Sequence, residues 1–242
     1  MITYRNLGQN GRLGNQLFQI AATIGIAKAN GMEYAFNKWE YEGYFKLQLP
    51  KAPLGEMSPL HEKDFSFTSY EVSPEVDYEL IGYFQSEKYW EHIKDEIIDG
   101  FDRVRATPPL IQLNPVVSVH VRRGDYLKLS NYHNNLTLDY YKKAMAMFPD
   151  SPFFVFSDDI DWCARNIKGN GISYIPSTVH EAESLKLMSQ CQHNIIANSS
   201  FSWWGAYLNR NPDKIVIAPK KWFGKDGPQN TKDLIPESWV TI

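Results

Sequence analysis

Two adjacent arginines follow a strand-like segment in the second half of the chain, and they are the residues best suited to chemistry. The run 116–121 alternates and is rich in β-branched residues, so it predicts a strand, and Arg122, Arg123, Gly124 and Asp125 come directly after it. In open α/β sheets, ligands bind at the carboxyl ends of the strands. Because a guanidinium group matches two phosphate oxygens at once, the pair predicts a ligand that carries phosphate. The alternative is a surface pair that forms an ion pair with Asp125.

The rest of the second half predicts the sheet that would position these arginines. Strand-like and helix-like segments alternate along it, which is typical of a doubly wound parallel sheet with right-handed crossovers. The predicted strands after the first are 153–156, 172–175, 194–197 and 214–218, and the predicted helices are 138–147, 160–167, 180–191 and 202–210.

Polar residues follow these strands as well, and we expect them at the same edge of the sheet. Asp158 is a candidate acceptor of hydrogen bonds from a base or a ribose. Ser199 and Ser200 are candidate phosphate donors, although they also read as the cap of a helix followed by buried aromatic residues. Asp159 and Asp161 form an Asp-x-Asp pair that could hold a metal. We favour the alternative that they interact with the N-terminus of the next helix, since two arginines already neutralise a diphosphate.

The first half is less regular. It predicts strands at 2–6 and 33–36, a glycine-rich turn at 8–16, a helix at 17–29 and a helix at 90–98. The spacing of Gly8, Gly11 and Gly14 does not match the fingerprint of dinucleotide-binding folds, but such a turn can present backbone amides to an anion. Pro108 and Pro109 precede the regular half, so we expect an N-terminal domain at 1–110 and a C-terminal domain at 111–242.

Composition excludes several classes of protein. The chain has 242 residues, 43% of them hydrophobic, and a formal net charge of −3, which does not favour nucleic acid or an anionic membrane surface. Residues 1–6 contain no apolar signal region, and the longest mostly apolar stretch, 20–27, is too short to span a membrane. Two cysteines without metal-ligand spacing suit a reducing compartment, so we expect a cytoplasmic protein without stable membrane insertion.

Six stretches, in order along the chain, resemble glycosyltransferase family 11, the α-1,2-fucosyltransferases. The more specific ones are His120-Val-Arg-Arg-Gly-Asp-Tyr and Asn198-Ser-Ser-Phe-Ser-Trp-Trp-Gly-Ala. The supporting ones are Gly11-Arg-Leu-Gly-Asn-Gln-Leu-Phe-Gln-Ile-Ala, Gly82-Tyr-Phe-Gln-Ser-Glu-Lys-Tyr, Phe154-Val-Phe-Ser-Asp-Asp and Ala218-Pro-Lys-Lys-Trp-Phe.

This resemblance implies an α/β fold of the GT-B type, with two Rossmann-like domains facing a cleft. The C-terminal domain would bind GDP-L-fucose, and a galactose-containing glycan would enter from the N-terminal side. The implied reaction is an inverting transfer that needs no metal and no cofactor. By position, Arg122 would contact the donor diphosphate, His120 and Arg123 would border the nucleotide, and Asp158 would face guanine or ribose. Ser199 and Ser200 would bind phosphate oxygens, and Asn15 with its turn would close over the sugar and diphosphate.

The catalytic base is not identified by the resemblance. We predict Asp125 first, because it adjoins the arginines, and Glu87 second; Asp125 could instead orient an arginine. His120, alone inside a strand, is more often a buried core residue than a base. Two other functions stay open: transfer of another GDP-deoxyhexose, and a non-catalytic carbohydrate-binding protein with a vestigial nucleotide site.

Overall fold

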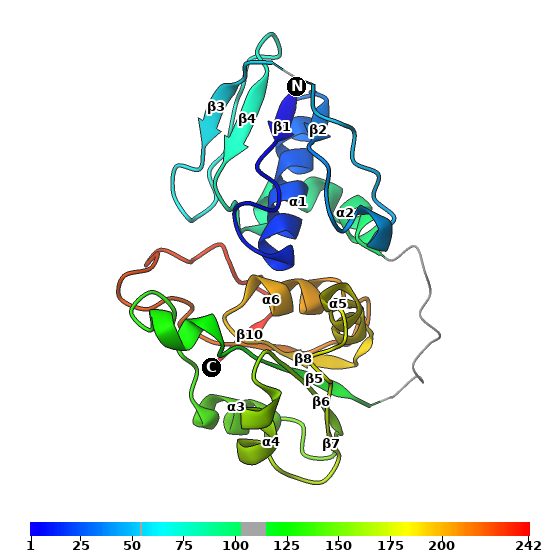
Figure 1. Cartoon of the computed structure of the whole chain (residues 1–242), viewed down its shortest axis with the longest axis vertical. Helices are drawn as coiled ribbons and strands as arrows, with labels where there is room; N and C mark the ends of the chain where they lie inside the picture. The colour runs from blue at the N-terminus through cyan, green and yellow to red at the C-terminus, as the bar shows by residue number, and fades with distance from the viewer. Residues whose placement is uncertain (54, 103–114) are drawn as a thin grey trace. The chain divides into compact units, whose positions relative to one another are not determined.

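The computed structural model describes the whole chain except Leu54 and residues 103–114 (Figure 1). The chain divides into two compact units. Unit 1 contains Met1–Ala106 and Asn230–Pro236, and unit 2 contains Thr107–Gln229 and Glu237–Ile242. The predicted domain boundary between residues 110 and 111 lies outside the described residues and stays a prediction.

Unit 2 is built on a six-stranded sheet in which every paired strand is parallel. The strand order is β10-β9-β8-β5-β6-β7, which confirms the predicted doubly wound α/β sheet. Only the last strand was not predicted, because it has two residues and follows a long irregular segment. The strands are β5 (Val117–Val121), β6 (Phe153–Ser157), β7 (Ile172–Tyr174), β8 (His193–Ile195), β9 (Val216–Ala218) and β10 (Val240–Thr241).

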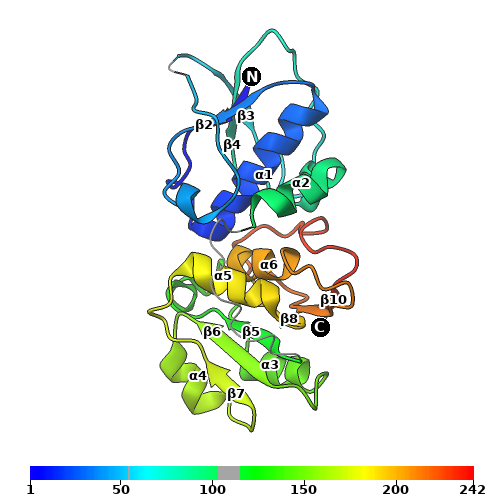
Figure 2. The same cartoon turned by 90° about the vertical axis from the view of Figure 1, so that its right-hand side faces the viewer.

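Helices cover both faces of this sheet (Figures 1 and 2). Helices α3 (Leu138–Met145) and α4 (Ile160–Asn166) lie on one face. There Tyr141, Phe148 and Cys163 join Val119 and Val155 of the strands in a buried core. Helices α5 (Glu181–Gln190) and α6 (Ser200–Tyr207) pack against each other on the opposite face. A 3-10 segment, η4 (Asp125–Leu129), follows β5.

The strand order reverses between β5 and β8. From β5 the chain adds β6 and then β7 on one side, and it returns to add β8, β9 and β10 on the other side of β5. Such a reversal opens a space above the carboxyl ends of the two strands, because their connections leave to opposite faces. The segments 122–126 and 196–200 therefore begin at the position where a doubly wound sheet binds its ligand.

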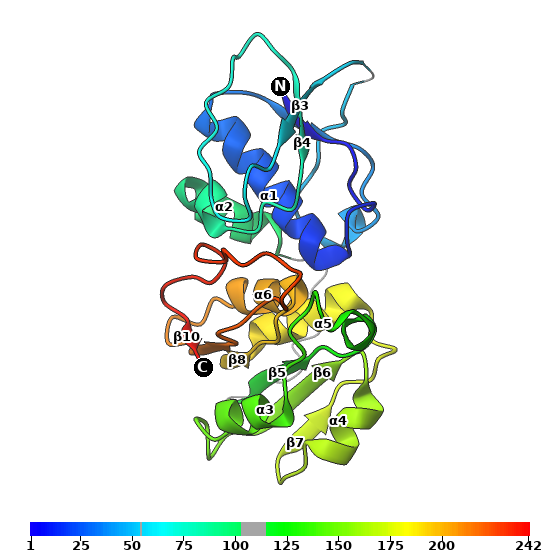
Figure 3. The same ribbon diagram turned by 90° about the vertical axis from the view of Figure 1, so that its left-hand side faces the viewer.

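Unit 1 has a smaller parallel sheet, in the order β2-β1-β4-β3. Its strands are β1 (Ile2–Tyr4), β2 (Tyr34–Phe36), β3 (Ser58–His61) and β4 (Tyr78–Ile81). Helix α1 (Leu13–Ala29) packs against β1 and β2 (Figure 3). The remaining elements are the 3-10 turns η1 (Glu42–Tyr44), η2 (Glu87–Tyr89) and η3 (Glu91–Ile93), and the short helix α2 (Lys94–Gly100).

Two expectations for unit 1 were wrong in detail, and two strands were not predicted. Helix α1 begins at Leu13, four residues before the predicted start, so the last four residues of the predicted glycine-rich turn are helical. The predicted helix 90–98 is a 3-10 turn followed by α2. Strands β3 and β4 were not predicted, because the segment 39–83 is rich in aromatic residues and prolines and shows no period. No helix in the described part of the chain combines the length and apolar composition needed to cross a bilayer.

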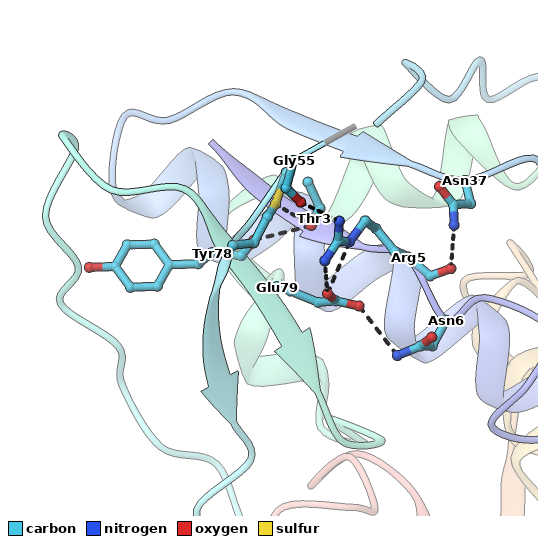
Figure 4. Close-up of polar contacts among 8 residues, drawn as sticks. Thr3, Arg5, Asn6, Asn37, Gly55, Tyr78 and Glu79 are labelled. Carbon is cyan, nitrogen blue, oxygen red and sulfur yellow. Dashed lines mark hydrogen bonds and ion pairs between the residues drawn. The ribbon is translucent and has the colours of Figure 1, made fainter. Parts of the chain in front are cut away.

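Two polar networks hold unit 1 together. Arg5, directly after β1, donates from Nε and Nη2 to Glu79 of β4 at 3.0 and 2.6 Å and from Nη1 to the Gly55 carbonyl (Figure 4). The C-terminal segment of the unit is held by Asp233, which accepts from the Phe67 amide at 3.1 Å and pairs with Lys88 at 2.6 Å. Sequence reasoning gave neither network, because the partners are far apart in the chain.

Candidate functional site

Arg122 lies at the carboxyl end of β5 between two carboxylates. Its Nη1 lies 2.9 Å from Asp158 Oδ2, and its Nη2 donates to Asp125 Oδ1 at 2.5 Å. Its side chain is 14% exposed, and its buried Nε finds no hydrogen-bond partner among the described residues. A buried guanidinium nitrogen without an acceptor is costly, so this Nε is a candidate contact for a ligand.

Arg123 is held differently. Its guanidinium carbon lies 3.9 Å from the centre of the Trp162 ring, and its Nε donates to Asp159 Oδ2 at 3.1 Å. Asp159 also caps α4, because its Oδ1 accepts from the Trp162 amide. The expectation that Asp159 interacts with the start of this helix is confirmed. Arg123 is therefore fixed against α4, whereas Arg122 lies between η4 and the end of β6.

Asp158 connects the two arginines. It binds the Arg122 side chain with one oxygen and accepts from the Arg123 backbone amide with the other, at 2.9 Å. A Cβ atom on Gly124 would lie 2.5 Å from the Asp158 carboxylate, so the glycine makes room for this residue. Asp158 thus orders the segment Arg122–Asp125, which we call the arginine turn. Its predicted contact with a base or ribose stays a prediction. The cluster contains two guanidinium groups and three carboxylates, so negative charge exceeds positive charge by one.

His120 is buried in β5, only 5% exposed, with its ring 5.6 Å from that of Phe201 in the first turn of α6. Burial, assisted by the nearby Arg122 charge, lowers the pKa of His120 to about 3, so the imidazole is neutral at physiological pH. Its buried Nδ1 has no hydrogen-bond partner among the described residues. A neutral imidazole beside the start of α6 can exchange a hydrogen bond with a ligand there.

The start of α6 forms the other side of the site. Ser199 is its N-cap residue, but its side chain makes no capping hydrogen bond in the described structure, and the first turn has no acidic residue. A helix N-terminus attracts anions through its free amides and its dipole. The expectation that the tryptophans behind it are core residues is confirmed, since Trp203 and Trp204 are fully buried.

The arginine turn and the start of α6 belong to one cluster. Tyr126 of η4 donates its hydroxyl to the Asn198 carbonyl at 3.3 Å, which links the segment after β5 to the segment after β8. The residues that the sequence predicted for a site in unit 2 lie near the carboxyl ends of three neighbouring strands, β8, β5 and β6, or shortly after them. They are His120, Arg122, Arg123, Asp125, Asp158, Ser199 and Ser200. The described residues contain no group of three or more His, Cys, Asp or Glu that could hold a metal ion.

Asn15 and Glu87, the two other predicted residues, belong to unit 1. Asn15 lies in the first turn of α1 and its Oδ1 accepts from Gln85 Nε2 at 2.9 Å. Glu87 lies in η2, 3.5 Å from the ammonium group of Lys94. Their roles toward a ligand stay predictions.

The carboxyl edge of the unit 1 sheet carries a second polar group that sequence reasoning missed. Tyr4 donates its hydroxyl to the Gly82 carbonyl and accepts from Asn10. Glu62, directly after β3, accepts from the backbone amides of Tyr83 and Phe84, each at 2.8 Å. Burial raises the pKa of Glu62.

Phe84 has a φ of +53°, which is strained for an aromatic residue, so Glu62 stabilises a turn that the chain does not favour by itself. The signal for this turn was present in the stretch Gly82-Tyr-Phe-Gln, but its partner Glu62 is twenty residues away and no pattern connects them.

Comparison with known proteins agrees with this architecture. The profile of the family described as Glycosyl transferase family 11 matches residues 5–242. The α-1,2-colitosyltransferase of Escherichia coli is 36% identical over 182 residues, which cover 68% of this chain and 62% of that protein. The galactoside α-(1,2)-fucosyltransferase 2 of Rattus norvegicus is 30% identical over 245 residues, 86% of this chain and 67% of that protein.

A further relative and two solved structures complete the comparison. The O-antigen biosynthesis glycosyltransferase WbnK of Escherichia coli is 42% identical over 136 residues, but the match spans 52% of this chain and only 44% of that protein. The fucosyltransferase NodZ from Bradyrhizobium has a TM-score of 0.51 at 11% identity and covers 84% of this chain and 90% of its own. POFUT1 in complex with GDP has a TM-score of 0.50 at 14% identity, with 90% and 97% covered, so both share the fold.

Proposed function

The chain belongs to glycosyl transferase family 11, and from this premise and the geometry of unit 2 we propose that it transfers L-fucose from GDP-L-fucose to a galactoside hydroxyl, with an α-1,2 linkage. The observation that carries the proposal is the buried donor group of Arg122 beside the start of α6, at the reversal of strand order. The matched relatives include a galactoside α-(1,2)-fucosyltransferase. The match to this chain spans 44% of the length of the glycosyltransferase WbnK and 62% of that of the colitosyltransferase. The proposed compartment is the cytoplasm.

The proposed reaction is a direct displacement that inverts the anomeric carbon. The acceptor oxygen forms a bond to this carbon while the bond from the carbon to the β-phosphate oxygen breaks, and negative charge grows on the departing GDP. Arg122 stabilises that charge together with the amides of the first turn of α6, so that no metal is required. In unit 1, Asn15 is proposed to close over the sugar and diphosphate, and this unit binds the acceptor.

Asp125 is the proposed base for the proton of the acceptor hydroxyl. Its carboxylate is paired with Arg122, and its side chain is 47% exposed, so it is able to turn away when a diphosphate replaces it. Asp125→Asn therefore separates two roles. If Asp125 is the base, the variant should have a lower kcat and should lose the acid limb of the pH–rate profile. If Asp125 only orients Arg122, this limb should be unchanged. In both cases GDP is expected to bind Asp125→Asn at least as tightly as the wild type, since a competing carboxylate is neutralised.

A direct experiment tests the activity. The protein is incubated with GDP-L-fucose and a panel of galactosides, and the new linkage is located by NMR. Fucose on O2 of galactose supports the proposal. Absence of GDP binding in a thermal-shift titration would reject it, since a ligand of the folded state raises the melting temperature.

A related donor is the second candidate, because a relative that matches two thirds of this chain is named as a colitosyltransferase. Colitose is also a deoxyhexose, and the diphosphate site in unit 2 does not read the sugar. The same assay with GDP-colitose decides between the donors through the ratio of kcat/KM values.

A further inference from the structure

Two stacked rings and the guanidinium group next to them adjoin the proposed diphosphate site. The Arg122 guanidinium carbon lies 5.1 Å from the centre of the Tyr126 ring, and the Tyr126 and His133 rings are parallel, with their centres 3.6 Å apart and an angle of 2° between them. We call Arg122, Tyr126 and His133 the Arg122 stack. A cation over an aromatic face is attracted by the quadrupole of the ring, and the planar guanidinium group suits this packing.

The stack is fastened to the start of α6. The Tyr126 hydroxyl donates to the carbonyl of Asn198, which is only 1% exposed. The Asn198 side chain in turn donates to the carbonyls of Asn134 and Trp222, at 2.8 and 2.7 Å. One buried asparagine thus connects three loops, and Tyr126 joins that connection to the arginine turn.

The other end of the stack is also rigid. His133 forms an isolated antiparallel bridge with Phe223, and the amides of Gly224 and Asp226 donate to the carbonyls of Tyr132 and Asn131. A Cβ atom on Gly224 would lie 2.3 Å from the Asn131 carbonyl oxygen, so the two loops approach closely. The ring of His133 is therefore a fixed base on which the Tyr126 ring lies.

We infer that Tyr126 is a positioning residue that fixes the guanidinium of Arg122 relative to the first turn of α6. The two carboxylates bind the Arg122 nitrogens, but Asp125 is exposed. The Tyr126 ring lies beside the guanidinium group, 5.1 Å from its carbon, and the Tyr126 hydroxyl ties this ring to the segment before α6. Its consequence for GDP binding rests on the proposed function, whereas its effect on Arg122 does not.

The order of the Arg122 side chain tests this directly, without any ligand. The Nε–H order parameter is measured by NMR in the wild type and in Tyr126→Leu, Tyr126→Phe and His133→Ala, with the signal assigned from Arg122→Lys. We expect an ordered Arg122 in the wild type, a clearly lower order parameter in Tyr126→Leu and His133→Ala, and a smaller loss in Tyr126→Phe, which keeps the ring.

Tyr174 provides the matched control. It lies in β7 and donates its hydroxyl to the Ile167 carbonyl, as Tyr126 does to Asn198, but it belongs to the core beside α4. Tyr174→Leu and Tyr174→Phe are expected to leave the Arg122 order parameter unchanged. The inference is overturned if the Arg122 order parameter in Tyr126→Leu and in His133→Ala equals that of the wild type. If Tyr126→Leu does not fold, the Phe and His133 variants decide in the same way.

Affinity for GDP gives the second readout. We expect the GDP Kd to rise about tenfold in Tyr126→Leu, as for loss of one preorganised contact of ~1.4 kcal/mol, and less in Tyr126→Phe, with the acceptor KM unchanged. A wild-type protein that binds no GDP rejects the proposed function but leaves the NMR test valid. Lowered Arg122 order with an unchanged GDP Kd supports the positioning role of Tyr126 but overturns its consequence for GDP binding.

Discussion

In both sheets of this protein the first strand lies between strands that are added on opposite sides of it, but different side chains follow these first strands. In unit 2 the first strand, β5, lies between β6 and β8, and its carboxyl edge carries paired arginines and carboxylates beside a helix N-terminus. In unit 1 the first strand, β1, lies between β2 and β4, and Arg5 directly after it is bound by Glu79 of β4. The same edge carries Glu62, side-chain amides and the Tyr4 hydroxyl. Strand order alone therefore does not decide what is bound, and the paired arginines beside a helix N-terminus distinguish unit 2.

The largest effect is expected at Arg122, because it is the positively charged side chain proposed to stabilise the leaving diphosphate directly. Arg122→Ala is expected to lower kcat by roughly 10²–10³-fold, as for removal of one preorganised donor. Arg122→Lys is expected to recover little, since an ammonium group cannot bind two oxygens in the guanidinium geometry. Steady-state kinetics measures both, with the exposed Arg165→Ala on α4 as the control. Full recovery by lysine would remove the bidentate role.

Glu62 tests the corresponding edge of unit 1 through stability. In Glu62→Gln one of the two backbone amides that the carboxylate accepts faces an NH2 group instead, and the strained turn at Phe84 loses support. We expect a loss of about 1 kcal/mol, the typical net contribution of one hydrogen bond. Urea unfolding measures it, with the exposed Glu91→Gln as the control. A loss no larger than that of the control contradicts the assigned role.

The pH dependence of stability should differ in sign between the edges. Burial lowers the pKa of His120 from 6.5 to about 3. As pH falls below 6.5, the imidazole is therefore protonated in the unfolded chain but not in the folded protein. The free energy of unfolding decreases over this range. Burial raises the pKa of Glu62, so its contribution is lost as pH rises through the folded-state value.

Unfolding at pH 7.5 and 5.5 measures the His120 part. The wild type is expected to lose ~1 kcal/mol more than His120→Gln over this interval, because each unit of pKa difference corresponds to about 1.4 kcal/mol. The exposed His92→Gln serves as the control and should behave like the wild type. Equal losses in the wild type and His120→Gln contradict a neutral buried imidazole.

The smallest effect on turnover is expected at Arg123. Its guanidinium is bound to Asp159 and lies on Trp162, so it contributes mainly to the packing of the arginine turn against α4. We expect Arg123→Ala to lower kcat less than about tenfold and to lower the melting temperature, since a cation–π contact is worth about 0.5–2 kcal/mol. A fall in kcat equal to that of Arg122→Ala would show that the two arginines act as one unit on the substrate.

Local patterns predicted the parts of this site that lie near each other in the sequence. The alternation along 116–121 correctly predicted β5 with the two arginines directly after it, and the Asp-x-Asp pair was correctly assigned to a helix start in the case of Asp159. The pairing of Arg122 with Asp158 could not be predicted, because the residues are 36 positions apart and meet only when β5 pairs with β6.

The start of α1 shows the opposite failure. Gly11 and Gly14 favoured a turn, but helix α1 begins at Leu13 and includes Gly14. Gln16 and Gln19 on this helix donate to the carbonyls of Gly11 and Asn10, so tertiary contacts fix the loop that the sequence left undefined. The Tyr126–His133 contact was missed for the same reason, since stacking of rings leaves no period in the sequence.

A crystal structure of the protein with bound GDP tests the central claim most directly. We expect the diphosphate to lie at the first turn of α6, with the Arg122 guanidinium donating to its oxygens. We also expect Asp125 to have released Arg122 while Asp158 still holds it. A bound GDP whose phosphates lie away from both Arg122 and the start of α6, with the ion pair to Asp125 intact, would contradict the account.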